Sequence, residues 1–470
     1  MRKTFKNKNF IKKVLAIAFP IMLEQLLISS FGIVDTLMVK NIFRGIAGVG
    51  LGAQIGTSSG IVMFAFATGV GMYLAQYFGD EDTKNVKNSF SLLIILGFAV
   101  AFFFFILGFV FPRQILMLFS TDDQVLDIAT HYLRIASFAY FGNLLSYAYV
   151  IAYRNVQKPV VSLIMQTTFA ALNVLLNYLL IFGIGIFPKM GVEGAALATV
   201  ISSTLSLVAH IIYAKASKQI FVPNFNNYKV ALTRTFNKAI LKRSLPLFIN
   251  ESMFSLGTLI YIAIFNKLGP DAYEGYKIAD TIVTLWFSIS FGMNAAVTAM
   301  TGAQLGKGDT QTAKEYGDGF LWIGLLLSII IGGIVIVLAR PSVMIFNSAE
   351  VTSTTINIAI SLMYVSALRI VLKFFSNVTL AVFRAGGLTK FVLLMDSAVM
   401  WVVGIPIAFI GYRYLHITNI SILFLLMQFE AVARITISLI KYFKYDWLNN
   451  IIGKIIPRFD KKAVIRSTES

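Results

Sequence analysis

Twelve long apolar segments recur along the chain, and no other feature constrains its fold so strongly. Each is close to or above the length of about 20 apolar residues that a helix needs to cross a membrane. The segments lie at 14–37, 52–77, 90–111, 128–153, 160–184, 191–214, 245–268, 276–304, 320–338, 356–383, 391–412 and 420–443. The pattern predicts an all-α polytopic membrane protein with 12 transmembrane helices.

The composition agrees with a membrane protein and excludes most other classes. Of the 470 residues 57% are hydrophobic and only 13% are charged, about half the charged share of an ordinary soluble domain. The chain has no cysteine, so disulfides and thiolate metal sites are excluded, and its three histidines do not cluster. It shows no nucleophile constellation and no Gly-x-x-x-x-Gly-Lys-Ser/Thr motif. We therefore expect neither an enzyme nor an ATP-driven pump, and no cofactor.

The net charge of +18 first suggests a nucleic-acid partner, but the placement of the basic residues argues for a membrane instead. If the N-terminus faces the cytoplasm, most Lys and Arg fall in cytoplasmic segments. The predicted outer loops hold Lys40, Arg44, Arg113, Lys189, Lys267, Lys277, Arg340 and Arg413. The positive-inside rule then places both termini in the cytoplasm. Together with a Lys-, Asn- and Ile-rich composition, this predicts a multi-pass protein of the bacterial plasma (inner) membrane, without a nucleic-acid partner.

The two halves of the chain show an internal repeat. Three sets of residues align in order: Pro20 with Pro246 (an offset of 226), Ala75-Gln76 with Ala303-Gln304 (228) and Arg154 with Arg384 (230). Six helices per half preserve orientation, so the halves are parallel repeats related by a pseudo-twofold axis along the membrane normal. We expect an N-terminal six-helix lobe at 1–214, a basic cytoplasmic linker at 215–243, a C-terminal six-helix lobe at 244–443 and a basic cytoplasmic tail at 444–470.

From about residue 15 to residue 443 the local sequence resembles the multidrug and toxic compound extrusion (MATE) family. The motifs are Pro20 with Phe-Gly-Ile-Val-Asp-Thr-Leu-Met-Val around Asp35, the run from Leu172 to Thr199, and Phe-Arg-Ala-Gly-Gly at 383–387 with Asp396, Trp401, Gly404, Pro406, Glu430 and Arg434. The resemblance implies a secondary antiporter that exports amphipathic or cationic drugs in exchange for Na⁺ or H⁺. The same superfamily contains flippases of lipid-linked oligosaccharide precursors, which is the alternative function.

One set of polar residues in the N-terminal lobe has the chemistry of a cation site. Asp35 lies in the outer part of the first helix, Asn173 and Asn177 share one face of the fifth, and Thr199 lies at a similar depth in the sixth. A carboxylate, two amide oxygens and a hydroxyl are ligands that Na⁺ prefers, and a desolvated carboxylate can carry a proton instead. The resemblance places the family's N-lobe cation site on these positions, and the alternative is that the two asparagines only join helices.

Other intramembrane charges are secondary candidates, because each is costly to bury. Glu24 lies on the same face of the first helix as Asp35, about 16 Å further inward, as a second proton station or an ion-pair partner. Glu251 matches an acidic position that some family members use in a C-lobe cation site. Here Arg369 and Lys373 share a face of the tenth helix, and Lys373 falls where those members have a carboxylate. This favours an ion pair with Glu251 or a spot for an anionic substrate group.

Three charges near the end of the chain are expected to form gate or structural ion pairs. Glu430 and Arg434 are one turn apart in the last helix, and Asp396 lies near the inner end of the eleventh. The 41 Phe and 16 Met residues also suit an adaptable drug pocket, although the sequence does not select which of them line it.

The expected partners are membrane lipids and small amphipathic or cationic molecules, and the chain is expected to be a monomer. For an antiporter, the two lobes rock while Asp35 alternates between cation-bound and released states. A flippase favours a cleft rich in Arg and Lys that holds a pyrophosphate. Arg369 and Lys373 support that alternative, whereas the Asp-Asn-Asn-Thr set supports the antiporter.

Overall fold

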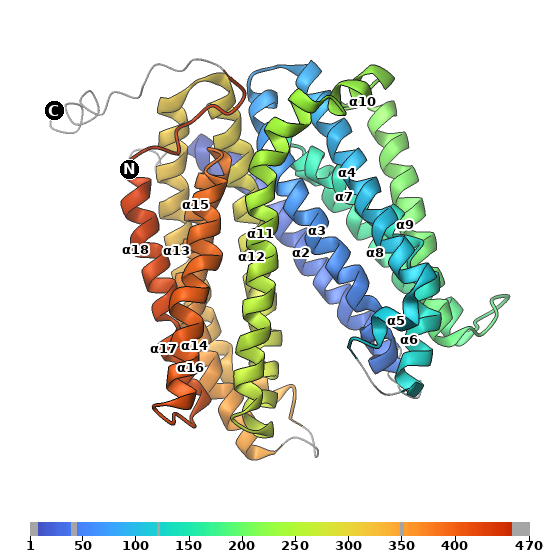
Figure 1. Ribbon diagram of the computed structural model, residues 1–470, viewed down its shortest axis with the longest axis vertical. Helices are drawn as coiled ribbons and strands as arrows, with labels where there is room; N and C mark the ends of the chain where they lie inside the picture. Colours follow the sequence, from blue (N-terminus) through green and yellow to red (C-terminus); the bar gives the residue numbers. More distant parts are fainter. Residues whose placement is uncertain (1–7, 39–44, 120–122, 348–351, 454–470) are drawn as a thin grey trace. The chain divides into compact units, whose positions relative to one another are not determined.

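The computed structural model describes residues 8–38, 45–119, 123–347 and 352–453, and the regular structure in these ranges is entirely helical (Figure 1). Eleven of the helices are long and apolar enough to cross a membrane, and a bent pair of helices brings the number of spans to 12. The predicted all-α polytopic fold is therefore confirmed. The 12 spans agree with the 12 apolar segments of the sequence.

The elements follow the chain order used in Figure 1. Up to residue 266 they are α2 (Lys8–Met38), α3 (Gly45–Gly79), α4 (Thr83–Val110), α5 (Pro112–Leu116), α6 (Asp123–Ala136), α7 (Ala139–Asn155), α8 (Pro159–Phe182), α9 (Gly191–Ala216), α10 (Phe225–Ala231) and α11 (Arg234–Asn266). The rest are α12 (Pro270–Lys307), α13 (Thr310–Met344), α14 (Ser353–Ala385), α15 (Thr389–Leu393), η1 (Leu394–Ala398), η2 (Met400–Gly404), α16 (Ile405–Arg413), α17 (Ile420–Met427) and α18 (Phe429–Tyr442).

The fourth predicted span is broken into two helices, α6 and α7, which are bent by 54°. Buried apolar residues alternate in α6 with a polar face, so this helix is amphipathic and not apolar all round. The polar face consists of the exposed residues Asp123, Asp127, His131 and Arg134. Its charges are compensated locally, since Arg113 in α5 pairs with Asp123 at 2.9 Å and also with Asp127. The chain turns between the two helices at Ser137 and Phe138.

The helices form two compact units. The N-terminal unit comprises Ala16–Leu74 and Thr83–Glu251, and the C-terminal unit comprises Met1–Leu15, Ala75–Asp82 and Ser252–Ser470. In the N-terminal unit α9 packs against α6, α7 and α8, and α4 packs against α7 and α10. In the C-terminal unit α14 packs against α12, α13, α17 and α18. The long helices α3 and α11 each contribute residues to both units.

Within the C-terminal unit, α3 and α12 cross at a contact made by two glycines. A Cβ atom on Gly79 would overlap the carbonyl group of Ala303, and one on Gly306 would overlap the carbonyl group of Gln76. Glycine therefore lets the two backbones touch, as in other close-packed membrane helices. The two contacting stretches are the ones that align in the internal repeat of the sequence.

The segment that follows α18 is fastened to this crossing by side-chain amides. Gln76 Nε2 donates to the carbonyl of Ala385 at 3.0 Å, and Gln76 Oε1 accepts from the backbone N–H of Ile451 at 2.8 Å. Asn450 Nδ2 donates to the carbonyl of Leu305 at 2.9 Å. The ends of α3, α12 and α14 are thereby held together by the last described residues of the chain.

The eleventh span contains two π-helical turns, η1 and η2, between α15 and α16. A π-helical turn widens the backbone and changes the direction in which side chains and carbonyl groups point. Pro406 is the second residue of α16, the α-helix that follows, and it has no N–H to donate to the preceding turn. This irregular stretch carries Asp396 within η1.

Candidate functional site

A chain of polar side chains lies between α8 and α9 in the N-terminal unit. Asn177 Nδ2 donates to Asn173 Oδ1 at 3.3 Å, and Asn173 Nδ2 lies 3.4 Å from Thr199 Oγ1 and 3.2 Å from Ser202 Oγ. The structure thus brings together three of the four residues of the expected cation site and adds Ser202. Asn173 is the hub of this polar cluster, which we define as Asn173, Asn177, Thr199 and Ser202.

Small residues at the start of α9 let the two helices approach closely enough for these contacts. A Cβ atom on Gly194 would lie 2.7 Å from the carbonyl oxygen of Leu180 in α8, and Ala195, Ala196 and Ala198 are buried at the same end of α9. Such small residues favour close packing of membrane helices and hydrogen bonds between them. Thr199 follows directly, and its hydroxyl also donates to the carbonyl of Ala195 at 3.0 Å.

Asp35 is a residue of helix α2, but the structure describes only its backbone and not its side chain. Its part in a cation site therefore stays a prediction from the sequence. The ligands that the described residues offer there are amide and hydroxyl oxygens, which are hard donors suited to a small cation.

Glu24 forms a buried ion pair with Arg154 in α7. Glu24 Oε1 lies 2.9 Å from Arg154 Nη2, and the two side chains are 0% and 9% exposed. The second carboxylate oxygen accepts from Ser162 Oγ in α8 at 3.0 Å. Of the two roles considered for Glu24, this geometry is that of an ion-pair partner joining three helices, α2, α7 and α8.

The C-terminal unit contains a cavity of about 70 Å³ whose lining includes both cations of the tenth span. Lys373 Nζ lies 4.7 Å from the ring centre of Phe254 and 5.2 Å from that of Phe287. Arg369 is 3.6 Å from Asp280 in α12 and lies over the ring of Phe424. The other lining residues are Thr258, Tyr261, Phe265, Tyr276, Met400, Met427, Gln428, Glu430, Ala431 and Arg434.

Arg434 organises the ionic contacts at the side of this cavity. Its Nη1 donates to Asp396 Oδ1 at 2.8 Å and its Nη2 donates to the Asp396 carbonyl at 2.9 Å, in the π-helical turn. It also pairs with Glu430, one turn away in α18. Glu430 Oε2 in turn accepts from the hydroxyl of Tyr261 at 2.8 Å, and Arg384 lies 3.8 Å from Asp396. The three predicted residues, Asp396, Glu430 and Arg434, are thus in one network.

Glu251 is the last residue of the N-terminal unit, whereas Arg369 and Lys373 belong to the C-terminal unit. Within its own unit its Oε1 accepts from Asn250 Nδ2 at 3.4 Å. A pairing of Glu251 with either cation therefore stays a prediction.

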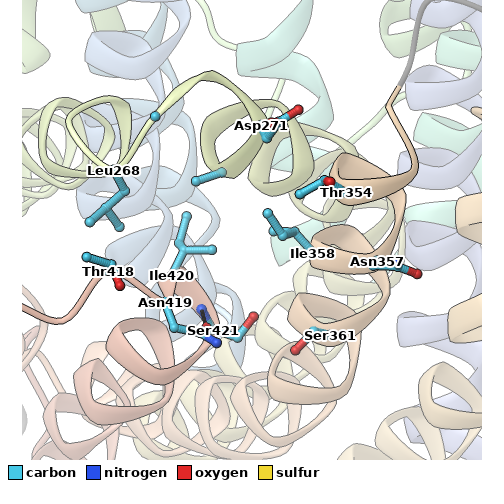
Figure 2. Close-up of a pocket in the computed structure, with 12 residues that line it drawn as sticks. Leu268, Asp271, Thr354, Asn357, Ile358, Ser361, Thr418, Asn419, Ile420 and Ser421 are labelled. Carbon is cyan, nitrogen blue, oxygen red and sulfur yellow. Dashed lines mark hydrogen bonds between the residues drawn. The ribbon is translucent and has the colours of Figure 1, made fainter.

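A second, larger pocket of about 550 Å³ lies where helix ends of the C-terminal unit meet (Figure 2). Its walls come from the start of α12, the first turns of α14 and the loop before α17. Asp271 accepts from the hydroxyls of Thr352 at 2.7 Å and Thr355 at 2.8 Å, and Asn419 caps α17 through the N–H of Ser421. Asp271 and Asn419 thus serve helix ends, and no residue of this pocket is among the candidates that the sequence predicts.

Several residues of these sites are not among the candidates that the sequence predicts, although simple signals in the sequence point to some of them. Ser202 follows Thr199 by three residues and so shares its helix face. Arg154 is a cation within a membrane helix, where a charge needs a partner. Tyr261 and Ser162 carry no such signal, because hydroxyls are common in membrane helices.

The fold and these sites define a helical membrane protein of the transporter class, and comparisons with known proteins give the family. The MatE family model matches the chain twice, at residues 20–179 and 246–410. These matches start at Pro20 and Pro246, the first aligned pair of the internal repeat. The chain belongs to the MatE family, as the resemblance in its sequence predicts.

Relatives match along nearly the whole chain. A probable multidrug resistance protein NorM of Thermotoga maritima is 25% identical over 93% of this chain and 93% of its own length. A probable multidrug resistance protein YoeA of Bacillus subtilis is 24% identical over 84% of this chain and 85% of its own. A crystal structure of the Vibrio cholerae MATE transporter VcmN, 15% identical, has a TM-score of 0.85 over 96% of this chain and 99% of that one, and it shows the same fold.

Proposed function

We propose that the chain is a multidrug efflux transporter of the bacterial plasma membrane with both termini in the cytoplasm. It exports amphipathic and cationic compounds by secondary antiport, in exchange for Na⁺ or H⁺, and no cofactor takes part. The relatives that are named multidrug resistance proteins and the family membership support efflux. The internal repeat supports alternating access by two lobes, and a monomer contains both.

The observation that carries the proposal is the polar cluster of α8 and α9. Asn173, Asn177, Thr199 and Ser202 are joined by hydrogen bonds within two helices that are long and apolar enough to cross a membrane. Polar side chains cost free energy in the membrane interior and are kept there where they bind an ion or substrate, or join helices. With Asp35 from α2 they supply a carboxylate, amide oxygens and hydroxyls to the coupling cation.

In this mechanism Asp35 holds either a lipophilic cation or the coupling ion. A buried carboxylate attracts a drug cation because its charge is poorly screened. Binding of Na⁺, or protonation, neutralises that charge and weakens the attraction. Entry of the coupling ion down its gradient then releases the drug on the outer side. Asn173 orients the neighbouring amide and hydroxyls, so the oxygens of the site need little rearrangement when the ion arrives.

The test is efflux of a fluorescent lipophilic cation from proteoliposomes, with an imposed Na⁺ gradient or pH gradient in separate runs. Export that responds to one gradient supports the antiporter and identifies the coupling ion. Folded protein that exports under neither gradient would contradict the proposal.

The second candidate function is flipping of a lipid-linked oligosaccharide precursor. The specific observation in its favour is the cavity of the C-terminal unit, because Arg369 and Lys373 both line it and a pyrophosphate needs cations. Translocation of a labelled polyprenyl pyrophosphate lipid across the same vesicles, without any response to the ion gradients, would support the flippase over the antiporter.

A further inference from the structure

The stretch from residue 215 to residue 243 carries basic side chains without any acidic ones. The sequence has no Asp or Glu between Glu193 and Glu251. The cations of the stretch are Lys215, Lys218, Lys229, Arg234, Lys238, Lys242 and Arg243. A cluster of Lys and Arg beside a membrane helix is a sign of contact with anionic lipids when its charges are free and face the membrane surface.

Three of these cations form a stripe along the first turns of α11. Arg234, Lys238 and Lys242 follow one another at intervals of four residues, so they share one face of the helix, and all three are exposed. The opposite face is packed, since Ser244 is buried and a Cβ atom on Gly69 of α3 would overlap its side chain. The cationic stripe, Arg234, Lys238 and Lys242, is therefore held in place by the close contact of α11 with α3.

The cations of the stripe have no acidic partner in the part of the chain that the structure describes. No carboxylate oxygen of these residues lies within 4.0 Å of their charged nitrogens. The ion pairs described in this unit are made instead by Arg113, His131 and Arg154. Arg243, the next cation along α11, is engaged within the unit, because its Nη1 donates to the hydroxyl of Tyr73 at 2.9 Å. The charge of the stripe is thus available to an anion outside the protein.

The same face of α11 becomes apolar directly after the stripe. Leu245 and Ile249 continue its spacing, and they are 55% and 38% exposed. A bilayer core needs about 20 residues of helix. Since α11 has 33 residues, its first turns extend beyond the core. At 1.5 Å per residue, Lys242 lies about 5 Å and Lys238 about 10 Å from Leu245 along the helix axis. These are depths at which long basic side chains reach the head groups of lipids, which form a layer about 5–8 Å thick.

The short helix α10 presents a second outer face of the same kind. Phe225, Lys229 and Leu232 recur at intervals of four and three residues, and the two apolar side chains are 75% and 62% exposed. The other side of α10 packs on α4 (Figure 1), where Asn227 Nδ2 donates to Asn88 Oδ1 at 2.7 Å. Exposed apolar side chains beside a cation, on a helix that is anchored by its opposite face, are typical of a segment that lies in the membrane interface.

We propose that the outer faces of α10 and of the first turns of α11 form a binding surface for anionic phospholipids. The cationic stripe and Lys229 bind the phosphate groups, and acyl chains lie against Leu245 and Ile249. These apolar neighbours favour a lipid over a soluble phosphate or a nucleic acid, neither of which has an acyl chain to place there. The inference goes beyond the proposed efflux function and does not depend on it.

The test measures which lipids lie beside this surface with a fluorophore attached to the protein. Because the chain has no cysteine, Thr233→Cys gives a single exposed site next to the stripe for labelling with NBD. The labelled full-length protein is placed in phosphatidylcholine nanodiscs that contain the same small fraction of a doxyl-labelled lipid, either phosphatidylglycerol or phosphatidylcholine. The ratio of NBD quenching by the two doxyl lipids gives the preference for the anionic one.

We expect the chain with the intact stripe to prefer the anionic lipid about fivefold or more, the effect of one cation near an anionic surface. Replacing all three residues of the stripe by Gln should bring the preference close to one. The matched control combines Lys12→Gln, Lys13→Gln and Lys307→Gln, which remove three exposed cations of the C-terminal unit, and it should keep the full preference. Equal quenching by the two lipids with the stripe intact, or a preference that survives its loss, would overturn the proposal.

Two further arms test the position and the kind of ligand. Lys242→Gln should reduce the preference more than Arg234→Gln, because Lys242 lies closer to the apolar part of α11, and the reverse order would overturn the assigned position of the phosphates. Glycerol 3-phosphate or a short single-stranded DNA in solution should leave the preference unchanged. Its loss would show that a soluble phosphate or a nucleic acid occupies the surface, which would overturn the assignment to a lipid. Efflux of a lipophilic cation by the variant without the stripe reports separately on the proposed function, so a failure of either proposal is recognised independently.

Discussion

Glu24 Oε1 lies 2.9 Å from Arg154 Nη2, and this pair joins α2 to α7 in the interior of the N-terminal unit. Both side chains are buried, and Ser162 of α8 donates to the second oxygen of the carboxylate. A buried pair of this kind adds little net stability over apolar residues, but either charge becomes very costly when its partner is removed. The Glu24 carboxylate therefore joins three helices through two contacts, the ion pair with Arg154 and the hydrogen bond from Ser162.

We expect Arg154→Met to lower the free energy of unfolding by about 3–5 kcal/mol, because it leaves the Glu24 carboxylate buried and unpaired. The double variant Glu24→Gln with Arg154→Met should recover most of this loss, since it removes both charges. Unfolding of the purified protein with increasing SDS, followed by tryptophan fluorescence, measures both effects. A double variant that is no more stable than Arg154→Met alone would show that the charge pair is not the cause.

Asp35→Asn should abolish ion-coupled export while the protein remains folded, because the amide keeps the volume of the side chain and removes its charge. The measurement is efflux of a lipophilic cation from proteoliposomes under the gradient that drives the unaltered protein, with size-exclusion chromatography as the check of folding. Asp446→Asn, which alters an exposed carboxylate of the ion pair with Lys441, is the matched control and should export normally. Normal coupled export by folded Asp35→Asn would refute the mechanism.

The polar cluster of α8 and α9 predicts a graded response to mutation. Asn173→Ala removes the contacts to Asn177, Thr199 and Ser202 together, so the apparent affinity for the coupling ion should fall at least tenfold. Ser202→Ala removes the 3.2 Å contact to Asn173 and the bond from the Ser202 hydroxyl to the carbonyl of Thr199, but it leaves the other contacts of Asn173 in place, so we expect a loss of about 1 kcal/mol, or roughly fivefold. Export rates measured against the concentration of the coupling ion give both affinities. Equal losses in the two variants would argue against Asn173 as the hub.

The crossing of α3 and α12 gives a prediction that does not concern ions. Gly306→Ala places a Cβ atom on the carbonyl of Gln76, and overpacking of this kind costs about 1–3 kcal/mol, so the crossing should open more often. Because the chain has no cysteine, Ala75→Cys supplies a single reporter that is fully buried beside this contact. A maleimide should label that cysteine about tenfold faster when Gly306→Ala is also present.

Gly333→Ala is the control for this experiment, since a Cβ atom on Gly333 in α13 meets no other atom within 4 Å. It should leave the labelling rate of Ala75→Cys unchanged. If both glycine variants label at the rate of the parent, the crossing does not limit access to Ala75.

The apolar segments of the sequence predict the helical spans well, because the length of a membrane-crossing helix is set by the thickness of the bilayer. The exception is the fourth span, where the structure has two helices. Asp127, His131 and Arg134 recur at the spacing of one helix face, and this polar period is the signal of an amphipathic segment. Hydropathy averaged over a whole span hides that period.

Contacts within one helix follow directly from the sequence, whereas among contacts between helices the sequence predicts the approach of Asn173 to Thr199 but not the partners of most charges. The pairing of Glu430 with Arg434 and the shared face of Asn173 and Asn177 follow from 3.6 residues per turn alone. The partner of Glu24 depends on which helix packs beside α2, and a hydropathy pattern does not contain that information. For the same reason the contact between Arg369 and Asp280 does not follow from the sequence.

The side-chain amide of Gln76 forms hydrogen bonds with three main-chain groups and so joins the end of α3 to two other segments of the chain. Its Nε2 donates to the carbonyls of Ala385 and Asn449, and its Oε1 accepts from the N–H of Ile451. Any movement that carries the end of α3 away from α14 exposes all three groups at once, and each must find water or a new partner. The end of α3, the end of α14 and residues 449–451 must therefore move as one body, unless all three hydrogen bonds of Gln76 break together.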